Sequence, residues 1–254
     1  MMNNIKMLLE FDGTNYSGWL KQSDESIITV QSAVEKSLFN LLGKYIEVTG
    51  CSRTDAGVHG LNYVVNFKTD STIPPNSMYK ALNPFLPDDI KAKSSEKADE
   101  DFHAVYSAKK KTYRYYFCFG EIEKPLYKNR VWNAYKKMTV SQKKILELTN
   151  KAASELVGTY DFSAFKAAGG IAKTSVRTIY SAKVKSLGKN LFCLEICGDG
   201  FLYNMVRIIA GTLVYVAIGK IQPNDIKSII ESKDRKKAGI TAPAHGLYLY
   251  KVYY

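Results

Sequence analysis

The most apolar stretch of the chain, residues 201–219, has to lie inside the folded protein. Its apolar side chains would cover nearly all sides of a helix, a pattern that is typical of a buried helix. The uncharged part covers only residues 208–219, which is too short to cross a lipid bilayer. We therefore expect a soluble protein in which other elements surround this helix.

Strand-like and helix-like patterns alternate along the rest of the chain. In the first half, strands are predicted at residues 5–11, 45–51, 61–67 and 90–93, and helices at residues 30–42 and 76–83. Thr29 is the expected N-cap of the first helix. In the second half, strands are predicted at residues 112–120, 178–184, 191–196 and 247–253, and helices at residues 141–157, 201–219 and 224–232.

This order predicts an α+β fold with two βαββαβ-type halves that share a mixed, mainly antiparallel sheet. The halves are expected at residues 1–105 and 106–254. The charged, serine-bearing stretch at residues 93–101 is expected to be loose and to link the two halves.

The chain is strongly basic, with 36 Lys and Arg against 24 Asp and Glu and a formal net charge of +12. The positive electrostatic potential of such a chain attracts polyanions, so nucleic acid or an anionic membrane is the expected class of partner. Residues 109–116 combine basic and tyrosine side chains, which suits the stacking of unpaired bases. The same pattern is typical of an exposed strand, and both interpretations hold together.

The cysteines and histidines indicate neither a disulfide framework nor a structural metal site. Cys51, Cys118, Cys193 and Cys197 include no Cys-x-x-Cys pair, and the chain has three histidines. The first residues lack the pattern of a signal peptide. We expect a cytoplasmic setting and no metal.

The loop at residues 52–60 is the first candidate for chemistry. Asp55 lies there between two strand patterns, two residues after Arg53 and two before Gly57. An acid beside a guanidinium stays ionised and can act as a nucleophile or base, but an aspartate in a turn can also simply cap it. His59 follows four residues later and is interpreted as a structural or hydrogen-bonding histidine.

Arg207 is the second candidate, because it stands within the buried helix pattern. A buried guanidinium destabilises the fold unless a carboxylate pairs with it, and Asp55 is the expected partner. The alternative is an arginine that reaches the surface from the side of the helix.

Two further functions remain to be weighed. A metal-dependent nuclease would use Asp12, Asp55 and His59, but it needs clustered carboxylates at a Mg²⁺ site, and Asp12 is more simply a turn residue. A non-catalytic RNA-binding protein would keep the basic surface without the reactive residues.

Taken together, the motifs resemble the tRNA pseudouridine synthase A family over nearly the whole chain. In chain order they are FDGTNYSGW (11–19), TVQ (29–31), SRTDAGVH (52–59), ALN (81–83) with LP (86–87), FHA (102–104), KTYRY (111–115), DFSAF (161–165), GFL (200–202), NMVR (204–207), AP (242–243) and GL (246–247).

The resemblance implies two pseudo-symmetric halves with a basic cleft between them, assembled as a homodimer that uses no cofactor. It implies that Asp55 is the catalytic aspartate and that Arg207 forms a salt bridge with it. Tyr113 would stack against the target uracil, and Arg53 would fill the space left by the flipped base. The substrates implied are uridines at positions 38, 39 and 40 of the tRNA anticodon arm.

The chain departs from the family pattern at three positions. Val105 stands where an arginine often follows the FHA motif, Leu20 where glutamine is common, and Gly60 where alanine is frequent. None of them belongs to the expected catalytic set. They put in doubt which uridines, and even which RNA, this member modifies.

Overall fold

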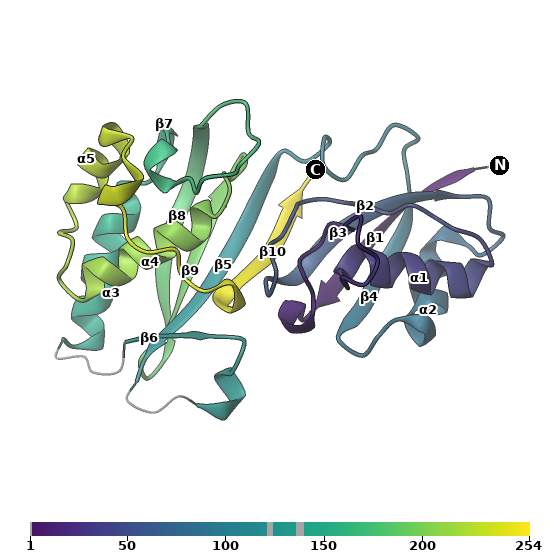
Figure 1. Ribbon diagram of the computed structural model, residues 1–254, viewed down its shortest axis with the longest axis horizontal. Coiled ribbons are helices and arrows are strands. Elements are labelled where there is room, and N and C mark those ends of the chain that lie inside the picture. Colours follow the sequence, from purple (N-terminus) through teal and green to yellow (C-terminus); the bar gives the residue numbers. More distant parts are fainter. Residues whose placement is uncertain (1, 121–123, 136–139) are drawn as a thin grey trace. The chain divides into compact units, whose positions relative to one another are not determined.

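The chain divides into two compact units in a computed structural model that describes residues 2–120, 124–135 and 140–254. The first unit comprises residues 1–109 and 248–254, and the second comprises residues 110–247. Each unit is built on a mostly antiparallel sheet with helices packed on it (Figure 1). The predicted α+β class is therefore confirmed. No helix in the described part of the chain is long and apolar enough to span a membrane.

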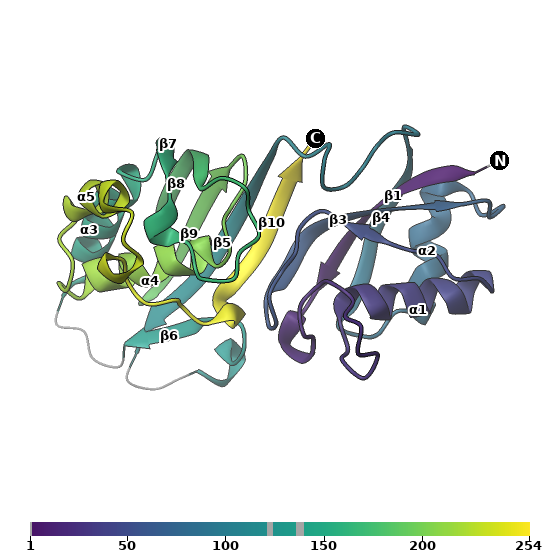
Figure 2. The ribbon, with the colours of Figure 1, turned by 45° about the horizontal axis from the view of Figure 1, so that its top comes forward.

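The sheet of the first unit has the strand order β4-β1-β3-β10, and a short strand β2 also pairs with β3. Figure 2 shows both of its helices on the same side of this sheet. The elements are β1 (Asn3–Phe11), η1 (Gly13–Asn15), α1 (Val30–Leu42), β2 (Thr49–Gly50), β3 (His59–Thr69), η2 (Pro75–Ser77), α2 (Met78–Leu82), η3 (Asn83–Phe85), β4 (Ile90–Ala98) and β10 (Leu247–Tyr253).

Strand β3 occupies the centre of this sheet and begins directly after the loop that carries Asp55. It runs antiparallel to β1 and parallel to β10, where Tyr248 lies opposite His59. The register between β1 and β3 shifts near their shared end, so that Phe11 lies opposite Gly60. A side chain at residue 60 would meet the Phe11 ring at 2.6 Å, which explains the glycine. Such bulges redirect side chains and are common near functional sites.

Helix α1 begins as its sequence predicts. Thr29 is the N-cap: its side chain accepts a hydrogen bond from the Ser32 amide, and the Ser32 hydroxyl accepts one from the Thr29 amide. The next two amides of the first turn, from Val30 and Gln31, donate to the carbonyls of residues 18 and 19 at 3.1 Å each. Because the first amides of a helix have no partner within it, these contacts tie the preceding loop to α1.

The prediction of a loose stretch at residues 93–101 is wrong for residues 93–98, because β4 continues to Ala98. Its charged side chains made the segment resemble a loop. They instead suit an edge strand that faces solvent, and they pair across to β1: Lys93 contacts Glu10 at 2.9 Å and Glu96 contacts Lys6 at 2.8 Å. The strand predicted at residues 45–51 is also too long, since β2 covers two residues.

The sheet of the second unit has the order β5-β9-β8-β7, all antiparallel, with β6 parallel to β5. Helix α3 packs against both β8 and α4, and α4 packs against β5. The elements are β5 (Lys110–Phe119), η4 (Pro125–Tyr127), β6 (Trp132–Tyr135), α3 (Gln142–Ser154), β7 (Gly158–Asp161), η5 (Ser163–Phe165), β8 (Val176–Gly188), β9 (Leu191–Gly198), α4 (Met205–Ala217), α5 (Asp225–Ser232), η6 (Arg235–Lys237) and η7 (Ala244–Gly246).

Helix α4 is the buried helix that the apolar stretch predicts, although it starts at Met205 rather than at residue 201. Eleven of its thirteen residues are buried. A neighbouring segment crosses it closely: a side chain at Gly211 would lie 1.9 Å from the Ile240 carbonyl, and the Gly239 amide donates to the Thr212 hydroxyl at 2.9 Å. Arg207 lies on the first turn of this helix.

Candidate active site

Asp55 lies in a tight turn between β2 and β3. The turn is closed by the Val58 amide, which donates to the Asp55 carbonyl at 3.2 Å. Gly57 has a φ of +78°, a backbone conformation that glycine adopts readily. Asp55 is half-buried and Arg53 is exposed. The loop therefore presents an acid and a guanidinium from a backbone that is locally closed on itself.

The start of this loop is anchored to β3 through Tyr63. The Tyr63 hydroxyl donates to the Ser52 carbonyl and accepts from the Ser52 amide at 3.3 Å. Its fully buried ring stacks on Trp19, with 4.4 Å between ring centroids. This stacking joins the loop to a second segment, residues 12–19, which we call the brace segment.

The brace segment holds the backbone on both sides of Asp55. The Trp19 amide donates to the Thr54 carbonyl at 3.1 Å, and the Tyr16 carbonyl accepts from the Gly57 amide at 3.3 Å. The backbones of the brace segment and of the Asp55 loop come too close for a side chain between them. A Cβ atom on Gly18 would lie 2.4 Å from the Thr54 carbonyl oxygen, and Gly18 has a φ of +89°. Glycine is therefore required here both by space and by backbone conformation.

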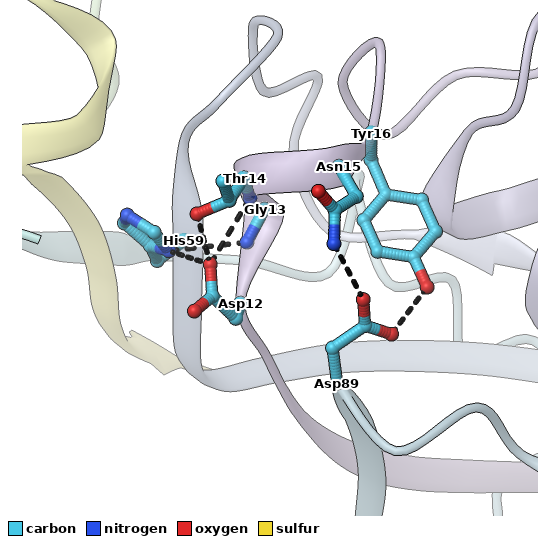
Figure 3. A network of polar contacts seen from close by, with 7 residues as sticks. All are labelled: Asp12, Gly13, Thr14, Asn15, Tyr16, His59 and Asp89. Atoms are coloured by element: carbon cyan, nitrogen blue, oxygen red, sulfur yellow. Dashed lines mark hydrogen bonds and ion pairs between the residues drawn. The ribbon is translucent and has the colours of Figure 1, made fainter. Parts of the chain in front are cut away.

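Polar side chains fix the brace segment itself, as Figure 3 shows. Asp12 caps the short helix η1, since its carboxylate accepts from the Thr14 amide at 3.0 Å and from the Thr14 hydroxyl at 2.5 Å. Further along, the Tyr16 hydroxyl donates to Asp89 at 2.5 Å. Burial, and then the Asp89 carboxylate, raise the pKa of Tyr16 above its usual value. The tyrosine consequently remains a neutral donor.

These contacts decide between two interpretations of Asp12. The carboxylate is occupied in capping a turn, as the simpler interpretation of the sequence holds. Within the described ranges, no group of three or more His, Cys, Asp or Glu side chains is arranged to hold a metal ion. The nuclease hypothesis required Asp12 as a metal ligand, and this geometry gives Asp12 another role.

Thr54 offers a test of the packing beside Asp55. Its hydroxyl oxygen is buried and has no hydrogen-bond partner among the residues that the structure describes. A buried hydroxyl without a partner destabilises the folded state by roughly 1–3 kcal/mol. We expect Thr54→Val, which keeps the branched shape, to raise the melting temperature by about 2–4 °C for each kcal/mol recovered. Differential scanning calorimetry checks this, and a lower melting temperature would contradict it.

Tyr113 lies on β5 in the second unit. It is 6% exposed, and its ring stands perpendicular to that of Phe201, with 5.2 Å between centroids. Tyr115, two residues along the same face of the strand, is fully buried and donates to the Pro243 carbonyl at 2.7 Å. Tyr113, Tyr115 and residues 201–207 thus bring aromatic and basic side chains together in the second unit.

Arg207 is half-buried and held in place by polar contacts within the second unit. Its Nε donates to the Ala242 carbonyl at 2.8 Å, and Nη1 donates to the Asn204 side chain at 2.7 Å. Asn204 precedes α4 with a φ of 59°, a left-handed conformation that asparagine tolerates better than most residues. The guanidinium is therefore oriented by its surroundings, unlike that of a freely extended surface arginine.

Comparison with known proteins agrees with this arrangement of motifs. The family model described as tRNA pseudouridine synthase matches residues 7–107 and 152–254. The chain belongs to the tRNA pseudouridine synthase family. Proteins named tRNA pseudouridine synthase A match over the full length of both chains: 49% identical in Acetivibrio thermocellus, 46% in Ruminiclostridium cellulolyticum and 44% in Thermoanaerobacter sp..

Membership of the pseudouridine synthase family confirms the resemblance that the motifs carry. The structure places Asp55 and Arg53 on one loop of the first unit, and Tyr113 and Arg207 in the second. The candidate site residues alone did not reveal the supports. Tyr63 holds Ser52 at the start of the Asp55 loop, Tyr16 is held by Asp89, and Asn204 holds the side chain of Arg207. The FDGTNYSGW motif already contained a signal of one support, because its two glycines mark close backbone approaches.

Proposed function

We propose that this chain isomerises uridine to pseudouridine in tRNA and that Asp55 is its catalytic residue. Membership of the family supports the reaction, and the fixed Asp55 loop supports the residue. Among the candidate residues, Asp55 alone carries a carboxylate, and hydrogen bonds fix the backbone before and after it at Thr54 and Gly57. A group that must meet a reacting atom at a defined position needs such preorganisation.

The chemistry needs few protein groups. The bond between N1 of uracil and C1′ of ribose breaks, the base turns, and C5 bonds to C1′. The proton on C5 is lost and N1 takes up a proton, so the product is an isomer of the substrate. Asp55 would either attack the substrate as a nucleophile or remove a proton to give a glycal intermediate. In both routes Asp55 is the proposed base for the proton on C5. The target base has to leave the helix stack first, which costs roughly a few kcal/mol.

Tyr113 is proposed to stack against the flipped uracil. The perpendicular Phe201 ring supports this role, because it restricts the orientation of the tyrosine ring. Arg53 is proposed to fill the space that the base leaves, and its exposed side chain on the Asp55 loop suits that role.

Arg207 is proposed to form an ion pair with Asp55, a role that follows from the family resemblance. The contacts to Asn204 and Ala242 support it, since they orient the guanidinium before a carboxylate binds. An oriented arginine loses less side-chain entropy when it forms a further hydrogen bond.

We also propose that the two units are pseudo-symmetric, of ferredoxin-like type. One local feature supports this. Asp12 directly follows β1 and Asp161 is the last residue of β7, and each carboxylate accepts from the amide and the hydroxyl two residues later at 3.0 and 2.5 Å. Each unit thus contains a turn with the same pair of hydrogen bonds after a strand.

The remaining parts of the proposal follow from the resemblance: action in the cytoplasm as a homodimer, on positions 38, 39 and 40 of the anticodon arm, without metal or cofactor. Sedimentation velocity tests the dimer. Primer extension after carbodiimide treatment of the product maps the modified positions.

The reaction itself is tested with unmodified tRNA that carries tritium at C5 of uracil. Isomerisation leaves the mass of the RNA unchanged but frees the hydrogen on C5, so released tritium measures the reaction. We expect release in the presence of EDTA, with the RNA remaining at full length. Tight binding to several tRNAs without release would contradict the proposal and favour a non-catalytic RNA-binding protein, whereas shortened RNA would indicate a nuclease.

Tyr113 gives a graded test of base stacking. We expect Tyr113→Leu to lower kcat/KM for tritium release by roughly 5- to 150-fold, because stacking of a base on an aromatic ring contributes about 1–3 kcal/mol. Tyr113→Phe keeps the ring and should retain most of the activity. Equal losses in the two variants would indicate that the hydroxyl, and not the ring, carries the function.

A further inference from the structure

We propose that His59 is a positioning residue for Asp55 and that it acts through the brace segment, residues 12–19. The proposal rests on the proposed function, because it takes Asp55 as catalytic. His59 itself is part of strand β3 and is 2% exposed, so it is placed to support the site from inside the first unit.

The first step is that the position of the Asp55 backbone depends on the position of the brace segment. Thr54 and Gly57, on either side of it, are both hydrogen-bonded to that segment, through Trp19 and Tyr16. A shift of the brace segment would therefore displace the backbone before and after Asp55. A displacement of about 1 Å at a reacting group can lower the rate on the order of 100-fold.

The second step is that His59 fixes the beginning of the brace segment. Its Nδ1 accepts a hydrogen bond from the Gly13 amide at 3.0 Å (Figure 3). The imidazole stacks on the Tyr248 ring with 4.5 Å between centroids and 23° between planes, which sets the direction of Nδ1. Because the donor is the backbone amide of Gly13, the bond holds the backbone of the brace segment directly.

The third step identifies the chemical group that is needed. Nδ1 lies 3.1 Å from an Asp12 carboxylate oxygen as well, and that contact would be an ion pair only with a protonated ring. The direction of the Gly13 amide proton is fixed by the backbone and points to Nδ1, so Nδ1 has to offer its lone pair. The Asp12 oxygen already accepts two bonds from Thr14. What the brace segment requires from residue 59 is therefore an acceptor at the δ position.

A second residue, Asp89, holds the brace segment at its beginning and in its middle. Asp89 accepts the Tyr16 hydroxyl through its carboxylate and the Asp12 amide through its carbonyl, at 2.5 and 2.9 Å. His59 and Asp89 thus hold the segment at two points, and Trp19 joins it to the Asp55 loop. Loss of either hold should relax the same part of the chain.

Two variants of nearly the same shape separate the acceptor from the rest of the ring. His59→Asn keeps an acceptor oxygen close to the position of Nδ1, whereas His59→Leu removes it, and both lose the stacking on Tyr248. We expect His59→Leu to lower kcat for tritium release by roughly 10- to 100-fold with KM for tRNA within about two-fold of wild type. His59→Asn should return kcat to within about three-fold of wild type.

His103→Leu is the matched control. His103 also accepts a backbone amide through Nδ1, from Val105 at 3.2 Å, and also lies against a tyrosine ring, that of Tyr106. It follows Phe102, whose carbonyl accepts from Asn4 near the far end of β1. Residues 4 and 12 are about 25 Å apart along an extended strand. This variant should therefore keep the kcat of the wild-type protein.

The outcomes separate the positioning role from the proposed function. Wild-type kcat in His59→Leu, or equal losses in the Asn and Leu variants, would overturn the positioning role. Should His59→Leu fail to fold, Tyr16→Phe removes the side-chain bond that holds the middle of the brace segment: lower kcat at unchanged KM supports the role, and wild-type kcat overturns it. An active Asp55→Asn variant would instead overturn the catalytic assignment of Asp55.

Discussion

Asp55→Asn is expected to abolish tritium release from tRNA, with a loss of kcat on the order of 10⁴-fold or more, as for the removal of other catalytic side chains. Asparagine has nearly the size of aspartate but carries no charge and is a poor nucleophile and base. The turn should survive, because the Val58 amide donates to the backbone carbonyl of residue 55, which the substitution keeps. The change therefore removes the chemistry and keeps the geometry.

Binding should behave differently from catalysis in this variant. Contacts with phosphates supply most of the affinity of proteins for nucleic acids, so the Kd for tRNA should stay within about three-fold of wild type. Filter binding at fixed salt measures it alongside the release of tritium. Asp24→Asn is a suitable control, since Asp24 also lies in a turn, where it caps Ser26, and is exposed. Activity above about 1% of wild type in Asp55→Asn would be too high for a residue that is essential to the reaction.

Gly13→Ala is expected to lower both the stability and the activity of the protein. The added Cβ atom would lie 2.0 Å from the Val58 carbonyl oxygen, and both partners belong to the backbone. The clash cannot be relieved by a side-chain rotation, so the brace segment or the Asp55 loop has to move. Overpacking of this kind costs about 3 kcal/mol, which lowers the melting temperature by roughly 6–12 °C.

Gly200→Ala separates the clash from the general effect of replacing glycine. Gly200 has no positive φ, and its nearest neighbour is the flexible Arg177 side chain, 3.4 Å from the Cβ position. Its melting temperature should stay within about 2 °C of wild type. Thermal unfolding of the two variants is the measurement. If Gly13→Ala has the melting temperature of the wild-type protein, the close approach between the brace segment and the Asp55 loop is wrong.

Elements with strong local signals were predictable from the sequence. Helix α1 begins at the expected cap, Thr29, because capping depends on residues that are close in sequence. Helix α4 is buried as its apolar stretch predicts. Strand β4 was missed in part because its charges belong to an edge strand, and β6 and β7 were missed because four-residue strands leave almost no pattern.

The candidate site divides in the same way. A turn at Asp55 was predictable, since an aspartate with a glycine two residues later gives a local signal, and Gly57 does have a positive φ. The supports of the turn were not expected. The bond between Gly13 and His59 joins residues 46 positions apart, and no spacing rule connects them. His59 was correctly interpreted as a hydrogen-bonding histidine, but its partner is visible only in the fold.

Strand β10, which completes the sheet of the first unit, is synthesised only after the whole second unit. The ribosome makes residues 1–109, then the 138 residues of the second unit, 110–247, and only then the strand that pairs with β3 beside His59. At about 5–20 residues per second this delay lasts roughly 7–28 s. Throughout it, nascent β3 has an unpaired edge directly after the Asp55 loop, where another strand could dock wrongly. The first part of the protein to be translated is thus among the last to be completed.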